Sequence, residues 1–307
     1  MTLARLTFRL QRSTIVFATI VCAGLAGAAL WLAFDMRSIL SRCDTPAATS
    51  ACDVVFAFQS SHMSAVYLTQ LGMNVAPFAL GIVLGVPVVT REVEQRTALI
   101  SWPLAGSRTR WLAWRVWPVF AVGLALVAVL AVASDQLARA YLPHIDIGFF
   151  EYQARGLPMA MRFALMAVAA IAMGAIVGRL LPSLLISIGV AVAISIGLQA
   201  ALPGWVEPAE VVEEFDFSPG SMTTEIRYRL PGGRVISADE GEMLMEQAYQ
   251  EAAGQEPDPA SLPEMVRIGI AAERYGEVVV RETAVLGAAI VLVGALAVVI
   301  VRRRRPE

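Results

Sequence analysis

The sequence predicts an all-α membrane protein with six transmembrane helices, an N-terminal amphipathic elbow helix and a small α/β exoplasmic insertion before the last helix. Three observations predict it. First, 57% of the 307 residues are hydrophobic and 16% are charged, whereas soluble domains carry about a quarter charged residues. Second, the apolar residues form six runs, each near the ~20 residues that cross a bilayer. Third, one long polar segment separates the fifth run from the sixth.

Residues 1–13 are predicted to form the elbow helix. Its arginines recur on one face and its leucines on another: Arg5, Arg9 and Arg12 against Leu3, Leu6 and Leu10. Such a helix is suited to lying in the membrane interface. A secretory signal peptide is the competing interpretation. No clear small-residue cleavage site follows and the next apolar run is about long enough to span, so we expect an uncleaved anchor.

Residues 14–202 are expected to hold the first five spans, and residues 282–307 the sixth span and a basic tail. The apolar runs cover residues 15–34, 72–90, 116–133, 158–177, 181–202 and 283–301. Two of them carry glycine pairs, Gly81 with Gly85 and Gly174 with Gly178, that permit close helix packing within one chain or between copies.

The arginines predict the orientation. With six spans, the N-terminal arginines, those of residues 91–115, Arg179 and those of residues 302–305 all fall on one side. The positive-inside rule makes this side the cytoplasm. We therefore expect a multi-pass membrane protein with both termini cytoplasmic.

The cysteines are few. Cys22 lies in an apolar run and is expected to be a packing residue. Cys43 and Cys52 lie close together in a predicted polar loop. If that loop is outside the cytoplasm they are a disulfide candidate; two unpaired thiols are the alternative. A mobility shift on reduction that is lost in Cys43→Ser would separate the two.

Residues 203–281 are predicted to form the exoplasmic insertion. Residues 224–230 alternate, Pro231-Gly232-Gly233 is a turn and residues 234–237 return, which predicts a hairpin. Residues 239–253 have helical spacing. The segment is rich in acidic residues, which could recruit a cationic substrate or form an ordinary solvated surface.

Sequence motifs of catalysis and cofactor binding are missing. The sequence has no P-loop, no H-E-x-x-H, no G-x-S-x-G and no C-x-x-C, and its two histidines lie in predicted outer loops. We expect no enzyme activity, no cofactor and no metal on this chain, and the net charge of −2 does not favour nucleic acid. No carboxylate lies well inside a predicted span. Arg162, in the first turn of the fourth run, is expected to snorkel to the interface. Proton-driven transport is therefore poorly supported.

Residues 91–115 are the main charged segment between spans, and we expect a cytoplasmic helix–turn–helix. Glu92 and Arg96 have the favourable i, i+4 order, so the second span can continue as helix until Pro103 ends it. Ser107 can cap the next helix. The arginines alone could serve only to set topology. The two glutamates, Glu92 and Glu94, add nothing to that signal, which favours docking of a partner.

This segment resembles the permease subunits of ABC-2-type exporters common in actinobacteria. The residues that match their pattern are Gly85, Pro87, Arg91, Glu92, Glu94, Thr97, Arg108, Trp111 and Leu112, while Arg96 replaces the usual glycine. Looser similarity extends to Phe150, Gly156, Gly174, Gly178, Leu181 and Pro182, and then to Arg274, Tyr275 and Glu282.

The resemblance implies the permease subunit of an ABC exporter for an amphipathic substrate (a drug, lipid or peptide). It implies a second permease copy or paralogue, and two copies of an ABC ATPase that hold ATP and Mg²⁺. The coupling segment would comprise Arg91, Glu92, Glu94, Arg96, Thr97, Trp102, Arg108, Arg110 and Trp111. The substrate path would lie along the second and fifth spans, with Asn74, Ser183, Ser187, Ser195 and Gln199 as polar candidates. Serines in spans more often bond their own helix.

The alternative function is a non-transporting membrane protein whose exoplasmic insertion binds a partner or senses envelope stress. An ATPase that is encoded beside this chain and purifies with it would favour the transporter.

Overall fold

The computed structural model describes residues 11–43, 49–95, 97, 106–141, 147–211, 220–251 and 262–303, with only the backbone at residues 40, 42, 43, 49–61 and 211. It divides into two compact units. The helical unit takes residues up to 143, 151–198 and from 279 onward. The second unit takes residues 144–150 and 199–278. Most of the predicted elbow helix, residues 1–10, lies outside the described residues.

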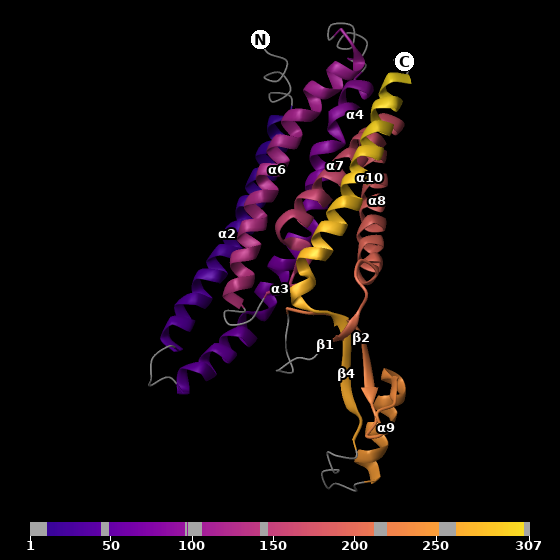
Figure 1. Cartoon of the computed structure of the whole chain (residues 1–307). Helices are drawn as coiled ribbons and strands as arrows, with labels where there is room; N and C mark the ends of the chain where they lie inside the picture. The colour runs from indigo at the N-terminus through magenta and orange to yellow at the C-terminus, as the bar shows by residue number, and fades with distance from the viewer. Residues whose placement is uncertain are drawn as a thin grey trace. The chain divides into compact units, whose positions relative to one another are not determined.

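The helices are α2 (Arg12–Cys43), α3 (Thr49–Gly85), α4 (Pro87–Glu94), α6 (Arg108–Tyr141), α7 (Gly156–Val177), α8 (Leu180–Ala201) and α10 (Tyr275–Arg303), with a 3₁₀ turn η1 (Tyr152–Ala154) before α7. Six segments among the described residues are long and apolar enough to cross a membrane, with α3 and α4 contributing one segment together. This confirms the six predicted spans (Figure 1).

The helices are longer than the apolar runs that predicted them. The predicted polar loop around the two cysteines is wrong, because α2 continues to Cys43 and α3 already begins at Thr49. A helix, once formed, gains a hydrogen bond for each added residue, so it need not end where the hydrocarbon ends. The side chains of Cys43 and Cys52 lie outside the described residues, so their pairing stays a prediction.

Helices α3 and α7 form the centre of the helical unit. The most hydrophobic stretch is 67% buried in the span of α3 and 61% buried in α7. The corresponding stretches of α8 and α10 are each 17% buried, so these two helices are peripheral. Glycines allow the close approach of α3 to α7. A Cβ added at Gly81 would lie 2.8 Å from the Met166 Cβ, and one at Gly85 would lie 2.8 Å from the Ala167 carbonyl oxygen. The predicted glycine pair of the second span thus packs within the chain.

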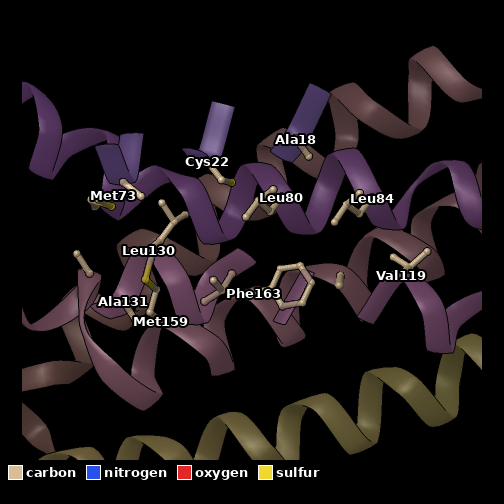
Figure 2. Close-up of a cluster of buried hydrophobic side chains, with 14 of the residues drawn as sticks. Ala18, Cys22, Met73, Leu80, Leu84, Val119, Leu130, Ala131, Met159 and Phe163 are labelled. Atoms are coloured by element: carbon tan, nitrogen blue, oxygen red, sulfur yellow. The ribbon is translucent and has the colours of Figure 1, made fainter. Parts of the chain in front are cut away.

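Figure 2 shows the part of the main apolar cluster that four of its helices contribute. Its labelled residues are Ala18 and Cys22 from α2, Met73, Leu80 and Leu84 from α3, Val119, Leu130 and Ala131 from α6, and Met159 and Phe163 from α7. Phe163 is fully buried. Its ring lies against Gly123 of α6, where a Cβ would come within 2.0 Å. These contacts fix the level of α6 against α7.

The second unit contains a four-stranded antiparallel sheet of order β1-β4-β2-β3. Its strands are β1 (Ala209–Val211), β2 (Met222–Arg229), β3 (Val235–Ser237) and β4 (Glu264–Ile270), and helix α9 (Ala238–Glu251) follows β3. Two further 3₁₀ turns, η2 (Leu202–Gly204) and η4 (Ala272–Arg274), flank the sheet in the chain. The predicted hairpin is confirmed by the pairing of Arg229 with Val235 around a turn in which Gly233 has φ 82°.

Charged pairs cover one face of this sheet. Arg229 donates to Glu210 at 2.6 Å and to Glu264 at 3.4 Å. Arg227 donates to Glu225 at 2.8 Å, and this bond lowers the pKa of the Glu225 carboxyl. The other face carries Tyr228, whose ring meets Gly241 of α9. The sequence-predicted mixed α/β insertion before the last helix is therefore present.

Candidate functional site

The arginine-rich segments of the helical unit meet at one end of the bundle. Arg91 of α4 donates to the Thr14 hydroxyl of α2 at 3.3 Å. Arg108, at the start of α6, donates to the Arg302 carbonyl near the end of α10 at 2.8 Å. Figure 1 shows α4 and the C-terminal end of α10 at this same end. The arrangement agrees with the single-sided placement on which the predicted orientation rests.

The charged elbow, residues 87–95, 97 and 106–115, has well-defined helix ends. Pro87 is the first residue of α4, where its missing N–H costs nothing. The Thr97 hydroxyl donates to the Glu92 carbonyl at 3.4 Å, which satisfies a carbonyl at the end of α4. The helix ends at Glu94, so the predicted unbroken continuation of the second span beyond this residue is wrong. Pro103, its predicted end, lies outside the described residues. The Ser107 cap is confirmed, because the Ser107 hydroxyl accepts from the Arg110 amide at 3.2 Å.

Glu92 faces the interior. Its carboxylate accepts a hydrogen bond from Arg115 of α6, and the two side chains are only 8% and 11% exposed. The Arg115 guanidinium also lies over the ring of Trp111, 5.9 Å from its centroid, and Trp111 is buried. Glu92, Arg115 and Trp111 thus hold α4 against α6. The predicted partner of Glu92, Arg96, lies outside the described residues, as does Trp102.

Glu94 connects the elbow to α8. Its Oε2 accepts a hydrogen bond from the backbone amide of Leu180, the first residue of α8, at 3.2 Å. A carboxylate there interacts favourably with the unpaired amides and the positive end of the helix dipole. Glu94, Thr97 and Arg110 are exposed, and Arg91 and Arg108 are partly so. These side chains are available to a docking protein.

Helix α8 turns its polar residues inward. Ser183 and Ser187 are fully buried and Ala191 is buried, whereas Leu181 and Leu185 on other faces are more than 60% exposed. Ser195 continues the i, i+4 series and is partly buried. Gln199, the next in the series, is exposed and belongs to the second unit. In a membrane, this helix presents leucines to lipid and hydroxyls to the bundle.

The hydroxyls differ in their partners. Ser183 donates to the Arg179 carbonyl of its own helix at 2.6 Å, as expected of serines in spans. The Ser187 Oγ is buried and accepts or donates no hydrogen bond among the described residues. Asn74 of α3, the other path candidate, donates to Glu151 at 3.0 Å, while its Oδ1 is buried without a partner in the described part of the chain.

The sequence reasoning missed a buried ion pair. Arg162 of α7 and Glu282 of α10 are 1% and 0% exposed, with Nη2 2.7 Å from Oε1. The expectation that Arg162 snorkels is wrong, and so is the expectation that no carboxylate lies inside a span. Helix α10 begins at Tyr275, eight residues before the sixth apolar run, which places Glu282 two turns inside it. The signal was an arginine inside the fourth apolar run and a glutamate directly before the sixth.

The short segment before α7 joins three other helices. Glu151 accepts from Asn74 of α3, and the Tyr152 hydroxyl donates to Glu282 of α10. Arg155 donates to Asp135 of α6 at 3.1 Å. Glu151 adopts the left-handed backbone conformation, with φ 50°, which a non-glycine residue rarely adopts. At this end of the bundle, opposite the elbow, polar contacts replace apolar packing.

Comparison with protein families places these features in a known context. Residues 18–206 match the model of the family "ABC-2 membrane transporter related", which covers more than half of the chain and spans α2 to α8. The chain belongs to this family. It is therefore a multi-pass membrane permease of an ABC transporter, and the family implies an ABC ATPase as its partner. Searches of the curated proteins and of the solved structures gave no match.

Proposed function

We propose that this permease is the transmembrane subunit of an exporter that moves an amphipathic substrate (a drug, lipid or peptide) across the bacterial cytoplasmic membrane. Two copies of a separate ATPase subunit would bind ATP and Mg²⁺ and hydrolyse the ATP, and a second permease copy or paralogue would complete the path. Hydrolysis on the partner leaves this chain without enzyme activity or cofactor. Both termini and the charged elbow would be cytoplasmic.

One observation carries the proposal: the Glu94 carboxylate accepts from the first amide of α8. An ATPase that docks on the exposed Glu94, Thr97 and Arg110 would press on α4. The Glu92–Arg115 pair ties α4 to α6, and Glu94 ties it to α8. Movement of the elbow would then displace the helix whose inward face carries Ser183 and Ser187. Docking changes transport only if the ATPase contacts two permease states differently.

The test is co-purification of the full chain with the ABC ATPase encoded beside it, followed by the ATPase rate with and without transported substrate. Glu94→Gln keeps the size of the side chain and removes its charge. We expect the variant to retain the ATPase and to lose roughly two- to fivefold of the substrate stimulation, the range of one charge at a helix end. Glu242→Gln, on the exposed surface of α9, is the matched control.

A second variant separates docking from coupling. Arg110→Ala removes an exposed guanidinium from the elbow and should weaken ATPase binding without altering thermal stability. If the wild-type chain retains no ATPase, the exporter proposal fails and the alternative of an insertion that binds a partner gains support. If Glu94→Gln behaves like Glu242→Gln, α8 is not coupled through this contact.

A further inference from the structure

Three hydrogen-bond donors converge on the buried carboxylate of Glu282. Arg162 donates through Nε at 3.2 Å and Nη2 at 2.7 Å to Oε1, and the Tyr152 hydroxyl donates to Oε2. Tyr152 is 4% exposed and the other two side chains are at or below 1%. A planar guanidinium fork with a nearby hydroxyl is the arrangement that recognises carboxylate and phosphate groups. We call Arg162 and Tyr152 the anion cradle.

The anion cradle and Glu282 belong to parts of the bundle that are buried to very different extents. Arg162 belongs to α7 and Tyr152 to the 3₁₀ turn that leads into it. The Arg162 guanidinium also lies 5.8 Å from the Tyr152 ring centroid, a contact independent of Glu282. Helix α7 is central, with 61% of its hydrophobic stretch buried, whereas the figure for α10 is 17%. If α10 separates from the bundle, the donors stay inside it.

An arginine left inside the bundle without an anion is strongly unfavourable, because a buried unpaired charge keeps its desolvation cost. Apolar residues at both positions would give comparable or greater stability, so stability alone does not account for the pair. Ionisable groups within spans mark substrate pathways. An anion brought by the substrate would replace Glu282 at no loss of hydrogen bonds.

We propose that Arg162 and Tyr152 form the binding site for the phosphate or carboxylate headgroup of an anionic amphiphile, and that Glu282 is an internal ligand that fills this site between transport cycles. The inference rests on the proposed export function and narrows its substrate class. The site lies near the end of the bundle opposite the elbow, six residues after α7 begins. The apolar tail would lie along α10, whose Val285 and Leu292 are 49% and 70% exposed.

The test is isothermal titration of the full chain in dodecyl maltoside, with empty micelles as the blank. The probes are dodecyl phosphate, dodecanoate, dodecyltrimethylammonium and inorganic phosphate. The wild type should bind the two anionic amphiphiles and not the cationic one. Glu282→Gln removes the internal competitor and should tighten dodecyl phosphate binding at least tenfold. Arg162→Gln should abolish it, and Tyr152→Phe, which retains the ring, should weaken it several-fold.

The matched control is Asp135→Asn, which removes the partner of Arg155 in a second partly buried pair (side chains 8% and 28% exposed) at the same end of the bundle. It should leave probe binding unchanged. The charge-exchanged variant Arg162→Glu/Glu282→Arg keeps an ion pair but should prefer dodecyltrimethylammonium. An exchanged variant that still prefers dodecyl phosphate, or a Glu282→Gln affinity equal to wild type, would overturn the proposal and leave the pair a structural one.

Two further outcomes overturn the proposal in its stated form. Inorganic phosphate bound as tightly as dodecyl phosphate would assign the site to a free anion. Where Glu282→Gln fails to fold, a Tyr152→Phe variant that binds dodecyl phosphate as tightly as the wild type would show that the cradle does not bind this headgroup. The titration needs no ATPase, so its failure is distinct from the failure of co-purification that would reject the export function.

Discussion

Buried charges in this permease are paired across helices. Glu92 meets Arg115 between α4 and α6, Arg162 meets Glu282 between α7 and α10, and Arg155 meets Asp135 between the segment before α7 and α6. Each pair fixes the relative level of two helices. Removing one partner should therefore cost more than removing both, because the remaining charge stays desolvated.

Glu92→Ala should lower the free energy of unfolding by about 3–5 kcal/mol, since it leaves Arg115 buried and unpaired. The double variant Glu92→Ala/Arg115→Met should recover most of this loss. Thermal unfolding in detergent, completed as a double-mutant cycle, measures both. A single variant as stable as the wild type would mean that the pair with Arg115 does not stabilise the fold.

Gly81→Ala should destabilise the bundle by about 1–3 kcal/mol, the range for overpacking, because the new Cβ would lie 2.8 Å from the Met166 Cβ and 2.9 Å from the Ala167 nitrogen. Gly24→Ala in α2 is the control, since nothing lies within 4 Å of its added Cβ. Thermal unfolding compares the two. Equal melting temperatures would contradict the close α3–α7 contact.

At the scale of the element, α8 buries its serines and exposes its large apolar side chains. Its exposed faces are leucine, isoleucine and valine, and its buried residues are Ser183, Ser187 and Ala191. Lipid is as apolar as a leucine side chain, so small and polar residues are favoured where helices meet. The buried stripe of Ser183, Ser187 and Ala191 is therefore compatible with helix packing and with a polar substrate path. Variants must be measured for both stability and transport to separate the two roles.

Ser187→Ala should leave the free energy of unfolding unchanged or raise it by up to about 1 kcal/mol, because the lost hydroxyl had no partner among the described residues. If the stripe lines the path, substrate-stimulated ATPase should fall while stability does not. Ser183→Ala, whose hydroxyl bonds its own helix, should have a smaller effect on transport. Equal transport in both variants would remove Ser187 from the path.

At the scale of the whole molecule, orientation is open to a direct test. Thr97→Cys and Arg303→Cys should react with a membrane-impermeant maleimide only in permeabilised cells, and Gly232→Cys in intact cells, after the native cysteines are replaced. The reason is the gathering of arginines at the elbow end, which the positive-inside rule assigns to the cytoplasm. Labelling of Thr97→Cys in intact cells would reverse the topology.

Local sequence signals predicted the parts of the fold that depend on local chemistry. Apolar runs predicted six spans, Pro231-Gly232-Gly233 predicted the hairpin, and Ser107 predicted the start of α6. Helix ends were less accurate, because α2 and α3 continue beyond the hydrocarbon-length runs and α4 ends at Glu94 before any proline. Backbone hydrogen bonding there depends on side chains several residues away, such as the Thr97 hydroxyl.

The sequence by itself determined that this chain is a multi-pass membrane protein with a charged elbow and a mixed α/β insertion, because hydrophobicity, turn residues and caps act over a few neighbouring residues. Only the tertiary structure decided that Glu92 points inward, that Glu94 meets the start of α8, and that Arg162 has Glu282 as its partner. Those contacts join residues 23, 86 and 120 positions apart, and no local rule states which distant charge will compensate a buried one.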